Sequence, residues 1–209
     1  MSEKIDFDFM KNAAFPKGEE GTEILSNMNE SHDELTTWTF NHIEFGERIL
    51  DIGCGGGAAI AKIGKLYPKS TIYGCDVSPV SIQCTCEKNK NLIDEGRLKV
   101  EECGVSKLNF PDESFDSIYS IESLYFWPNQ QEDLKEVFRV LKVGGKFITG
   151  LEMVGGNMNE KSTAIAEHLN MRCPSPEELK TLLENAGFSN VNIDYNKEKA
   201  WMCASAIRE

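Results

Sequence analysis

A glycine-rich turn directly after an apolar, acid-containing run constrains this chain more than any other feature. Residues 49–57 read I-L-D-I-G-C-G-G-G. The apolar part predicts a buried strand. The glycines predict a loop where a ligand approaches bare backbone, because glycine adopts positive φ freely and has no side chain. A helix pattern follows over residues 58–67, which turns free N–H groups toward the loop. The sequence therefore predicts a ligand site at this turn.

The carboxylate of Asp51 indicates the charge of that ligand. A dinucleotide pyrophosphate commonly occupies such a turn. A fixed carboxylate about 4 Å away would repel it by roughly 4 kcal/mol at an effective dielectric near 20, and would attract a cation equally. Residues 53–58 nevertheless fit the dinucleotide pattern G-x-G-x-x-G/A, so an NAD-dependent oxidoreductase remains an alternative.

The order of the predicted elements indicates the fold class. Strands and helices alternate from Arg48 onward, which favours a parallel sheet with helices on both faces. We expect an α/β, Rossmann-like, doubly wound sheet of seven mostly parallel strands that ends in an antiparallel hairpin. Ser175 and Glu178 predict the cap of the last helix. The expected strands cover residues 48–52, 71–75, 97–102, 115–121, 146–153, 191–195 and 200–207, and the expected helices cover 58–67, 79–90, 130–141 and about 177–185.

The chain divides into an N-terminal segment and a main domain. Residues 1–47 are expected to form a helical lid, and residues 48–209 the ligand-binding domain. Ser31 and Glu34 predict a capping box at the start of the second lid helix. The two helical patterns of the lid cover residues 19–28 and 33–45.

Charge and cysteine content exclude several function classes. The net charge of -12 would repel a nucleic-acid backbone, and the chain has no basic run to offset it. Residues 1–10 lack a signal-peptide pattern, and no apolar run is long enough to span a bilayer. The seven scattered cysteines suit a reducing compartment, so we expect a cytoplasmic protein. Cys84 and Cys86 point to different faces of a predicted helix, and no metal site is expected.

A second acid adds a nucleoside to the predicted ligand. Asp76 ends the second strand, where an acid is placed to accept both hydroxyls of a ribose. A ribose at Asp76 and a positive charge near Asp51 together describe S-adenosylmethionine, which carries a sulfonium and an ammonium at one end.

Four segments of the chain jointly resemble the class I S-adenosylmethionine-dependent methyltransferases. The segments are residues 51–57, Asp76, residues 115–118 and residues 138–145. The chain is most similar to the small-molecule branch that includes the ubiquinone and menaquinone C-methyltransferases. The resemblance implies S-adenosylmethionine as cofactor and in-line methyl transfer to a small-molecule acceptor. A methyltransferase-like protein that binds the nucleoside without turnover is the second alternative, because cofactor binding and acceptor chemistry use different residues.

The resemblance implies a set of cofactor-binding residues. Asp51 and the glycines would cradle the methionine end, Asp76 would bind the ribose, and Val77 would pack on the adenine. Gly104 stands where the family often has an acid for the adenine amino group, so backbone at Gly104 and Val105 is expected instead. The full set is Asp51, Gly53, Cys54, Gly55, Asp76, Val77, Gly104 and Val105.

The acceptor end is expected beyond the fourth strand, where residues 123–128 read S-L-Y-F-W-P. Sequence motifs of nucleobase-methylating members are absent there. A carboxylate within an aromatic cluster suits a cationic or amphipathic acceptor. His32, Glu122 and Tyr125 are predicted as catalytic residues, and Trp38, Phe126 and Trp127 as pocket residues. Structural roles remain open for His32 as a surface helix start, Glu122 as a solvated strand end, and Phe126 and Trp127 as core.

Overall fold

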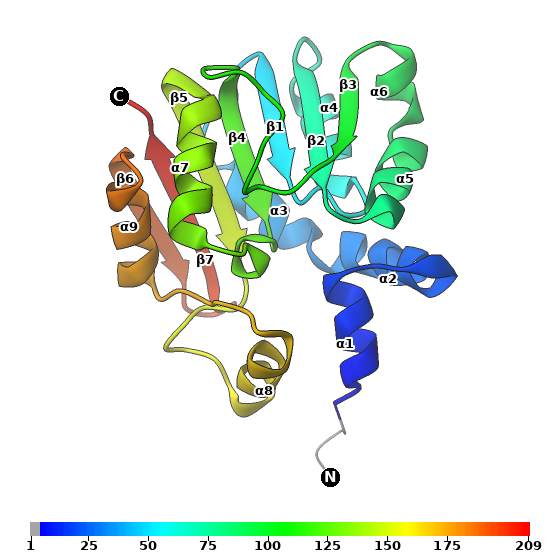
Figure 1. The fold of residues 1–209 in the computed structure, drawn as a ribbon, viewed down its shortest axis with the longest axis vertical. Coiled ribbons are helices and arrows are strands. Elements are labelled where there is room, and N and C mark those ends of the chain that lie inside the picture. Colours follow the sequence, from blue (N-terminus) through cyan, green and yellow to red (C-terminus); the bar gives the residue numbers. More distant parts are fainter. Residues whose placement is uncertain (1–4) are drawn as a thin grey trace.

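A seven-stranded sheet forms the centre of the computed structural model, which describes residues 5–209 (Figure 1). The strand order is β3-β2-β1-β4-β5-β7-β6. Strands β1 to β5 are parallel, whereas β7 runs antiparallel to both β5 and β6. The predicted fold class is confirmed. The strands are β1 (Arg48–Ile52), β2 (Thr71–Asp76), β3 (Leu98–Glu102), β4 (Phe115–Ile121), β5 (Leu141–Leu151), β6 (Ser189–Asn196) and β7 (Trp201–Ile207).

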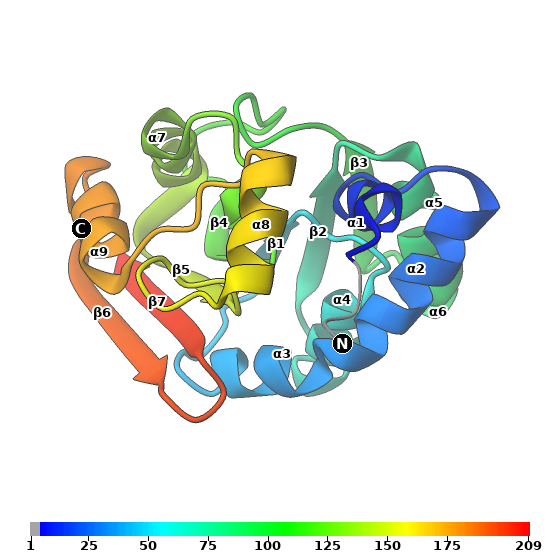
Figure 2. The same cartoon turned by 90° about the horizontal axis from the view of Figure 1, so that it is seen from below.

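Helices cover both faces of the sheet and its lower edge (Figures 1 and 2). The last helix begins at the predicted capping box, in which Ser175 and Glu178 satisfy each other's backbone N–H groups. A short 3-10 helix, η1 (Leu124–Phe126), follows β4. The α-helices are α1 (Phe7–Ala14), α2 (Gly18–Ser31), α3 (Asp33–Phe40), α4 (Ala58–Leu66), α5 (Pro79–Lys88), α6 (Lys90–Asp94), α7 (Gln130–Val140), α8 (Glu160–Leu169) and α9 (Pro176–Asn185).

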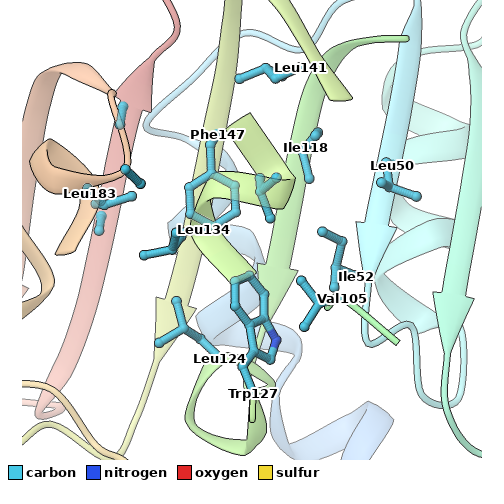
Figure 3. Close-up of a cluster of buried hydrophobic side chains, with 14 of the residues drawn as sticks. Leu50, Ile52, Val105, Ile118, Leu124, Trp127, Leu134, Leu141, Phe147 and Leu183 are labelled. Carbon is cyan, nitrogen blue, oxygen red and sulfur yellow. The ribbon is translucent and has the colours of Figure 1, made fainter. Parts of the chain in front are cut away.

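Alternating strand residues build two apolar clusters, one on each face. Consecutive residues of β1 point to opposite faces of the sheet. Leu50 belongs to the cluster under α7 and α9, and Ile49 belongs to the cluster on the opposite face. Leu134 and Leu183 pack toward Phe147 within the first cluster (Figure 3). Full burial of such side chains stabilises the fold by about 1.5–3 kcal/mol each. The rigid sheet that results fixes the positions of the strand ends.

The junction between α2 and α3 differs from the prediction. The capping box of Ser31 and Glu34 is wrong, because α2 continues through Ser31, whose hydroxyl donates to the Met28 carbonyl in the manner of a helix-interior serine. His32 occupies the N-cap position of α3 without a side-chain capping bond. Helix α3 ends at Phe40, five residues earlier than expected.

Two helices below the sheet were not predicted. Helix α1 is capped by Asp6 and α8 by Asn159, each accepting from a backbone N–H. Both lie beneath the lower ends of β1 to β5 (Figures 1 and 2). Phe7 of α1 stacks on His168 of α8 with ring centroids 4.1 Å apart. Their apolar patterns are short, and their partners are distant in sequence, so local periodicity could not find them.

The predicted lid has two structural parts. Helices α1 and α2 lie below the sheet, whereas α3 packs against β5 and contributes Phe40 to the second apolar cluster. No helix within residues 5–209 has both the length and the apolar character needed to cross a membrane.

Candidate active site

A cavity of about 350 Å³ lies at the carboxyl ends of β1, β2 and β4. This is the edge at which open parallel sheets bind ligands, and the volume falls within the range of small-molecule sites. The lid closes the other side of the cavity with residues of α1 and α2, among them Leu25 and Asn29. All eight residues predicted to bind the cofactor line this one cavity; their binding role stays a prediction.

The glycine turn after β1 presents backbone to the cavity. Gly53 has φ +80°, and a Cβ there would lie 2.5 Å from Cβ of Ser123, so packing against the protein requires glycine. Gly55 has φ +50°, and a Cβ there would meet only the Leu25 side chain at an ordinary 3.7 Å. Gly55 is thus constrained by its backbone conformation rather than by protein packing, and its surface is open to a ligand.

Asp76 joins the end of β2 to the glycine turn. Its Oδ2 accepts the Gly55 N–H at 3.0 Å, and its Oδ1 accepts the Ser78 N–H at 2.9 Å. Burial raises the pKa of Asp76, and the two backbone donors oppose that rise. Asp76 lines the cavity, where its carboxylate could accept a hydrogen bond from a ligand hydroxyl.

Asp51 places a buried acid at the end of β1. It is 2% exposed, and burial raises its pKa to about 8, with a smaller contribution from the Asp76 charge. The nearby Tyr119 hydroxyl opposes this rise, although it makes no hydrogen bond of ordinary geometry. Asp51 belongs to none of the ion pairs within residues 5–209. A cationic ligand would favour its ionised form.

Val77 and Gly104 form a narrow slot beside the turn. Val77 is 55% exposed, which is unusual for valine and leaves its side chain free to contact a ligand. A Cβ at position 104 would come within 3.3 Å of Val77 Cγ1, so glycine keeps the slot open. Val105 is buried at its inner end. This part of the cavity therefore has an apolar wall that no side chain at position 104 narrows.

Glu122 follows β4 and turns into the protein. Its φ of +57° is rare for a residue other than glycine. The side chain is 12% exposed, and its Oε1 accepts the Glu152 N–H at 2.6 Å. Burial, and then the Glu152 charge, raise the pKa of Glu122 to about 8. The alternative of a solvated strand end is therefore wrong.

His32 reaches the same end of the cavity from the lid. Its Nε2 lies 3.9 Å from Oε2 of Glu122, and its side chain is 22% exposed. Burial lowers the pKa of His32, which favours the neutral imidazole. His32 does stand at a helix start, as the N-cap of α3, but it is not a surface residue, because it lines the cavity.

The aromatic residues predicted for the acceptor pocket divide into two groups. Phe126 and Trp127 line the cavity, and Trp127 also belongs to the apolar core (Figure 3). Phe126 contacts Phe15 of the lid edge to face at 5.7 Å. For Trp127 the pocket and core interpretations therefore both hold.

Trp38 and Tyr125 do not line the cavity, which corrects the expectation that they border it. Trp38 stands two positions after Thr36, a cavity residue, and thus on the opposite side of α3. There it packs edge to face on His42 and against Trp201. Tyr125 is 2% exposed and lies behind Glu122 within the core.

Sequence reasoning predicted His32 but missed the other lid residues of the cavity, among them Leu25, Asn29 and Thr36. Together with His32 they follow one another at spacings of three or four residues along α2 and the start of α3, so they face the same side. Asn29 also donates a hydrogen bond to the Gly56 carbonyl at 3.2 Å, so the lid contacts the glycine turn directly. The spacing of three or four residues is the sequence signal that could have identified these lid residues.

Comparison with known proteins agrees with this geometry. The family model described as a methyltransferase domain matches residues 50–149 of this chain. These residues contain the glycine turn, Asp76 and the end of β4. The chain belongs to the class I S-adenosylmethionine-dependent methyltransferases. The cofactor of this family is S-adenosylmethionine.

Two curated methyltransferases illustrate the relationship. Sterol 4-C-methyltransferase of Caenorhabditis elegans is 32% identical over 183 residues, covering 84% of this chain and 53% of the relative. The ubiquinone/menaquinone biosynthesis C-methyltransferase of Haemophilus ducreyi is 27% identical over 176 residues, covering 72% of this chain and 67% of the relative. The chain spans about half the length of several such methyltransferases.

Solved methyltransferase structures share the fold. Geranyl diphosphate C-methyltransferase of Streptomyces coelicolor superposes with a TM-score of 0.75 at 14% identity, covering 93% of this chain and 86% of that chain. Phosphoethanolamine N-methyltransferase 2 of Haemonchus contortus, solved with S-adenosyl-L-methionine, superposes with a TM-score of 0.77 at 13% identity. The match covers 99% of this chain and 60% of that chain. At such identities the likeness establishes the fold alone.

Proposed function

We propose that this protein transfers a methyl group from S-adenosylmethionine to a small-molecule acceptor. The observation that carries the proposal is the arrangement of two buried acids around one glycine turn. Asp76 holds the turn through the Gly55 N–H, and Asp51 stands beside it without a cationic partner among residues 5–209. A ligand with a ribose and a cationic end satisfies both acids.

Each part of the cavity has a proposed role in binding the cofactor. Asp51 and the backbone around Gly53, Cys54 and Gly55 hold the cationic methionine end. Asp76 accepts the ribose hydroxyls. Val77 and Gly104 enclose the adenine, and the backbone of Gly104 and Val105 contacts its edge. This orientation leaves the methyl group directed toward Glu122.

Methyl transfer at this site depends mainly on positioning. The acceptor atom attacks the methyl carbon in line with the breaking C–S bond, and the sulfonium becomes a neutral thioether. Holding both reactants in this geometry supplies a large part of the rate, about 7–11 kcal/mol in well-oriented systems. His32 and Glu122 are proposed to orient the acceptor or to receive its proton, whereas Tyr125, which does not reach the cavity, is proposed to position Glu122.

The walls of the cavity favour an apolar or amphipathic acceptor. Phe15, Phe126 and Trp127 give it an aromatic surface, with the acid of Glu122 at one point. Relatives named for a sterol, a fatty acid and a quinone support an acceptor of this size class. The net charge of -12 argues against nucleic acid. Seven free thiols support a cytoplasmic location.

A metabolite-extract screen with methyl-labelled S-adenosylmethionine tests the proposal. We expect label in a small molecule with the wild-type protein and loss of that signal with Asp51→Asn. Asp94→Asn, which changes an exposed acid paired with Lys90, is the matched control. Cofactor binding without transfer to any acceptor would favour the non-catalytic alternative.

A further inference from the structure

We propose that His32, Glu122 and Glu152 form a binding site for one divalent transition-metal ion at the acceptor end of the cavity. One donor atom from each residue lies within 4.8 Å of the other two. The three residues are far apart in the sequence, which is why the sequence predicted no metal site.

The fold brings the three residues together from separate elements. Strands β4 and β5 are parallel neighbours that pair Ile121 with Gly150, so Glu122 and Glu152 leave the sheet side by side. The backbone N–H of Glu152 holds Oε1 of Glu122 at 2.6 Å, which leaves Oε2 free. His32 meets these acids from the junction of α2 and α3.

The distances suit metal ligands better than a direct contact. His32 Nε2 and Glu122 Oε2 are 3.9 Å apart, which is too long for a hydrogen bond. Two ligands that each lie about 2.1 Å from one ion are separated by about 3.4–4.2 Å, depending on the bond angle. The Glu152 donor lies within 4.8 Å of the other two, so a bound ion would draw it slightly closer.

The charges around the cluster call for a cation. Glu122 makes no ion pair with Lys or Arg within residues 5–209. The half-buried Glu152 carboxylate is influenced by the charge of Lys199, but the Lys199 amino group is fully exposed and bound to Glu34 at 2.8 Å. A buried carboxylate with a second carboxylate beside it is costly without a cationic partner.

The Tyr125 hydroxyl gives a second indication of a polar ligand. Tyr125 is 2% exposed, and its hydroxyl has no hydrogen-bond partner of ordinary geometry among the described residues. It lies against Glu122 and close to Glu152. Native proteins pair nearly all buried polar atoms, so this hydroxyl marks a place where a ligand or its bound water completes the pairing.

The donor set selects the class of ion. One imidazole with two carboxylates, and no thiolate, suits Mn²⁺, Fe²⁺ or Zn²⁺ better than Ca²⁺ or Mg²⁺, which prefer oxygen alone. Three protein ligands leave coordination positions open. His32 and Glu122 line the cavity whereas Glu152 does not, so an ion held by all three would be open to the acceptor on the side of His32 and Glu122.

The consequence for chemistry rests on the proposed methyl transfer, whereas ion binding itself does not. An acceptor hydroxyl held at this cluster loses its proton to solvent more readily, because the ion stabilises the oxygen anion. That oxygen then bonds to the methyl carbon as the C–S bond breaks, which leaves a methyl ether and a thioether. The acceptor class is thus a small apolar molecule with a hydroxyl.

Titration with Mn²⁺, followed by the loss of its free-ion electron paramagnetic resonance signal, tests the site without cofactor or acceptor. We expect one tight site per chain in the wild type, and dissociation constants raised at least tenfold in both His32→Ala and Glu152→Gln. His42→Ala is the control, because His42 pairs with Asp194 at 2.8 Å outside the cavity. Circular dichroism and thermal melting report whether each variant is folded.

Three results would overturn the inference. These are no Mn²⁺ binding to the wild type, equal binding in folded His32→Ala and Glu152→Gln, and binding of tetramethylammonium in place of Mn²⁺, which would make an organic cation the occupant. Titration of the wild type with S-adenosylhomocysteine separates this inference from the proposed function. If the protein binds S-adenosylhomocysteine but not Mn²⁺, only the metal site is contradicted. If it binds Mn²⁺ but not S-adenosylhomocysteine, only the cofactor site is contradicted.

Discussion

The Asp76 carboxylate accepts the backbone N–H of Gly55 at 3.0 Å and so ties the second strand to the turn after the first. One side chain thereby shapes the loop and offers acceptors to a ligand beside it. Cofactor affinity should depend on Asp76 through both effects.

Replacement of Asp76 by alanine should weaken S-adenosylhomocysteine binding by about 1.5–3 kcal/mol, the usual contribution of hydrogen bonds to a charged group. Isothermal titration calorimetry measures this as a rise of roughly 10- to 150-fold in the dissociation constant. Asp94→Ala serves as the control, since Asp94 forms only an exposed pair with Lys90. An unchanged constant in a folded Asp76→Ala protein would place the ribose elsewhere.

Valine at position 55 should abolish cofactor binding. A side chain there would occupy the surface that the cofactor approaches, and φ of +50° is strained for a β-branched residue. Alanine should weaken binding less and cost about 1 kcal/mol of stability from backbone strain. Gly96→Ala is the matched control for Gly55→Ala, because Gly96 also has a positive φ, +70°, and a Cβ there would meet nothing within 4 Å. Full binding by Gly55→Val would show that the turn does not touch the ligand.

The stability of the cofactor-free protein should depend on the ionisation of Asp51. Its folded pKa of about 8 exceeds its ordinary value of 3.8. Ionisation is thus disfavoured in the folded state. The resulting penalty is absent below about pH 4, grows as the pH rises and is complete above about pH 8, where it is on the order of 5 kcal/mol.

Asp51→Asn removes this penalty. Urea unfolding should show the variant gaining several kcal/mol over the wild type at about pH 8.5, and much less at about pH 5. Tyr119, Asp76 and Cys54 face Asp51 and interact with its charge, so the measured gain also includes the relief of their own ionisation. A gain independent of pH would show that Asp51 is ionised throughout this range.

Glu122→Gln should separate acceptor chemistry from cofactor binding. The variant keeps the shape of the side chain and removes its charge, so turnover should fall by roughly one to three decades, or about 1.4–4 kcal/mol. Cofactor dissociation constants should change much less. Glu132→Gln alters an exposed residue on α7 and provides the control. Equal losses in turnover and in cofactor affinity would assign Glu122 to the cofactor instead.

The sequence predicted the sheet and the residues that line the cavity at its carboxyl edge well, because both depend on local patterns. Strand periodicity, the glycine turn and the acid at the end of β2 are each readable within a few residues. The lid and helix α8 were predicted less well. Helices α1 and α8 are held by contacts between distant segments, such as Phe7 with His168.

The acceptor end shows the same limit of local reasoning. Trp38 was expected in the cavity, but the helix phase set by its neighbours turns it toward His42. The approach of Glu152 and His32 to Glu122 arises from strand pairing and lid docking, which no single segment encodes.

Calorimetric titration of the wild-type protein with S-adenosylhomocysteine and with NAD tests the central claim most directly. The account predicts one S-adenosylhomocysteine bound per chain and no measurable NAD binding, because Asp51 disfavours a pyrophosphate at the glycine turn. NAD binding of comparable affinity, or no binding of S-adenosylhomocysteine, would contradict it.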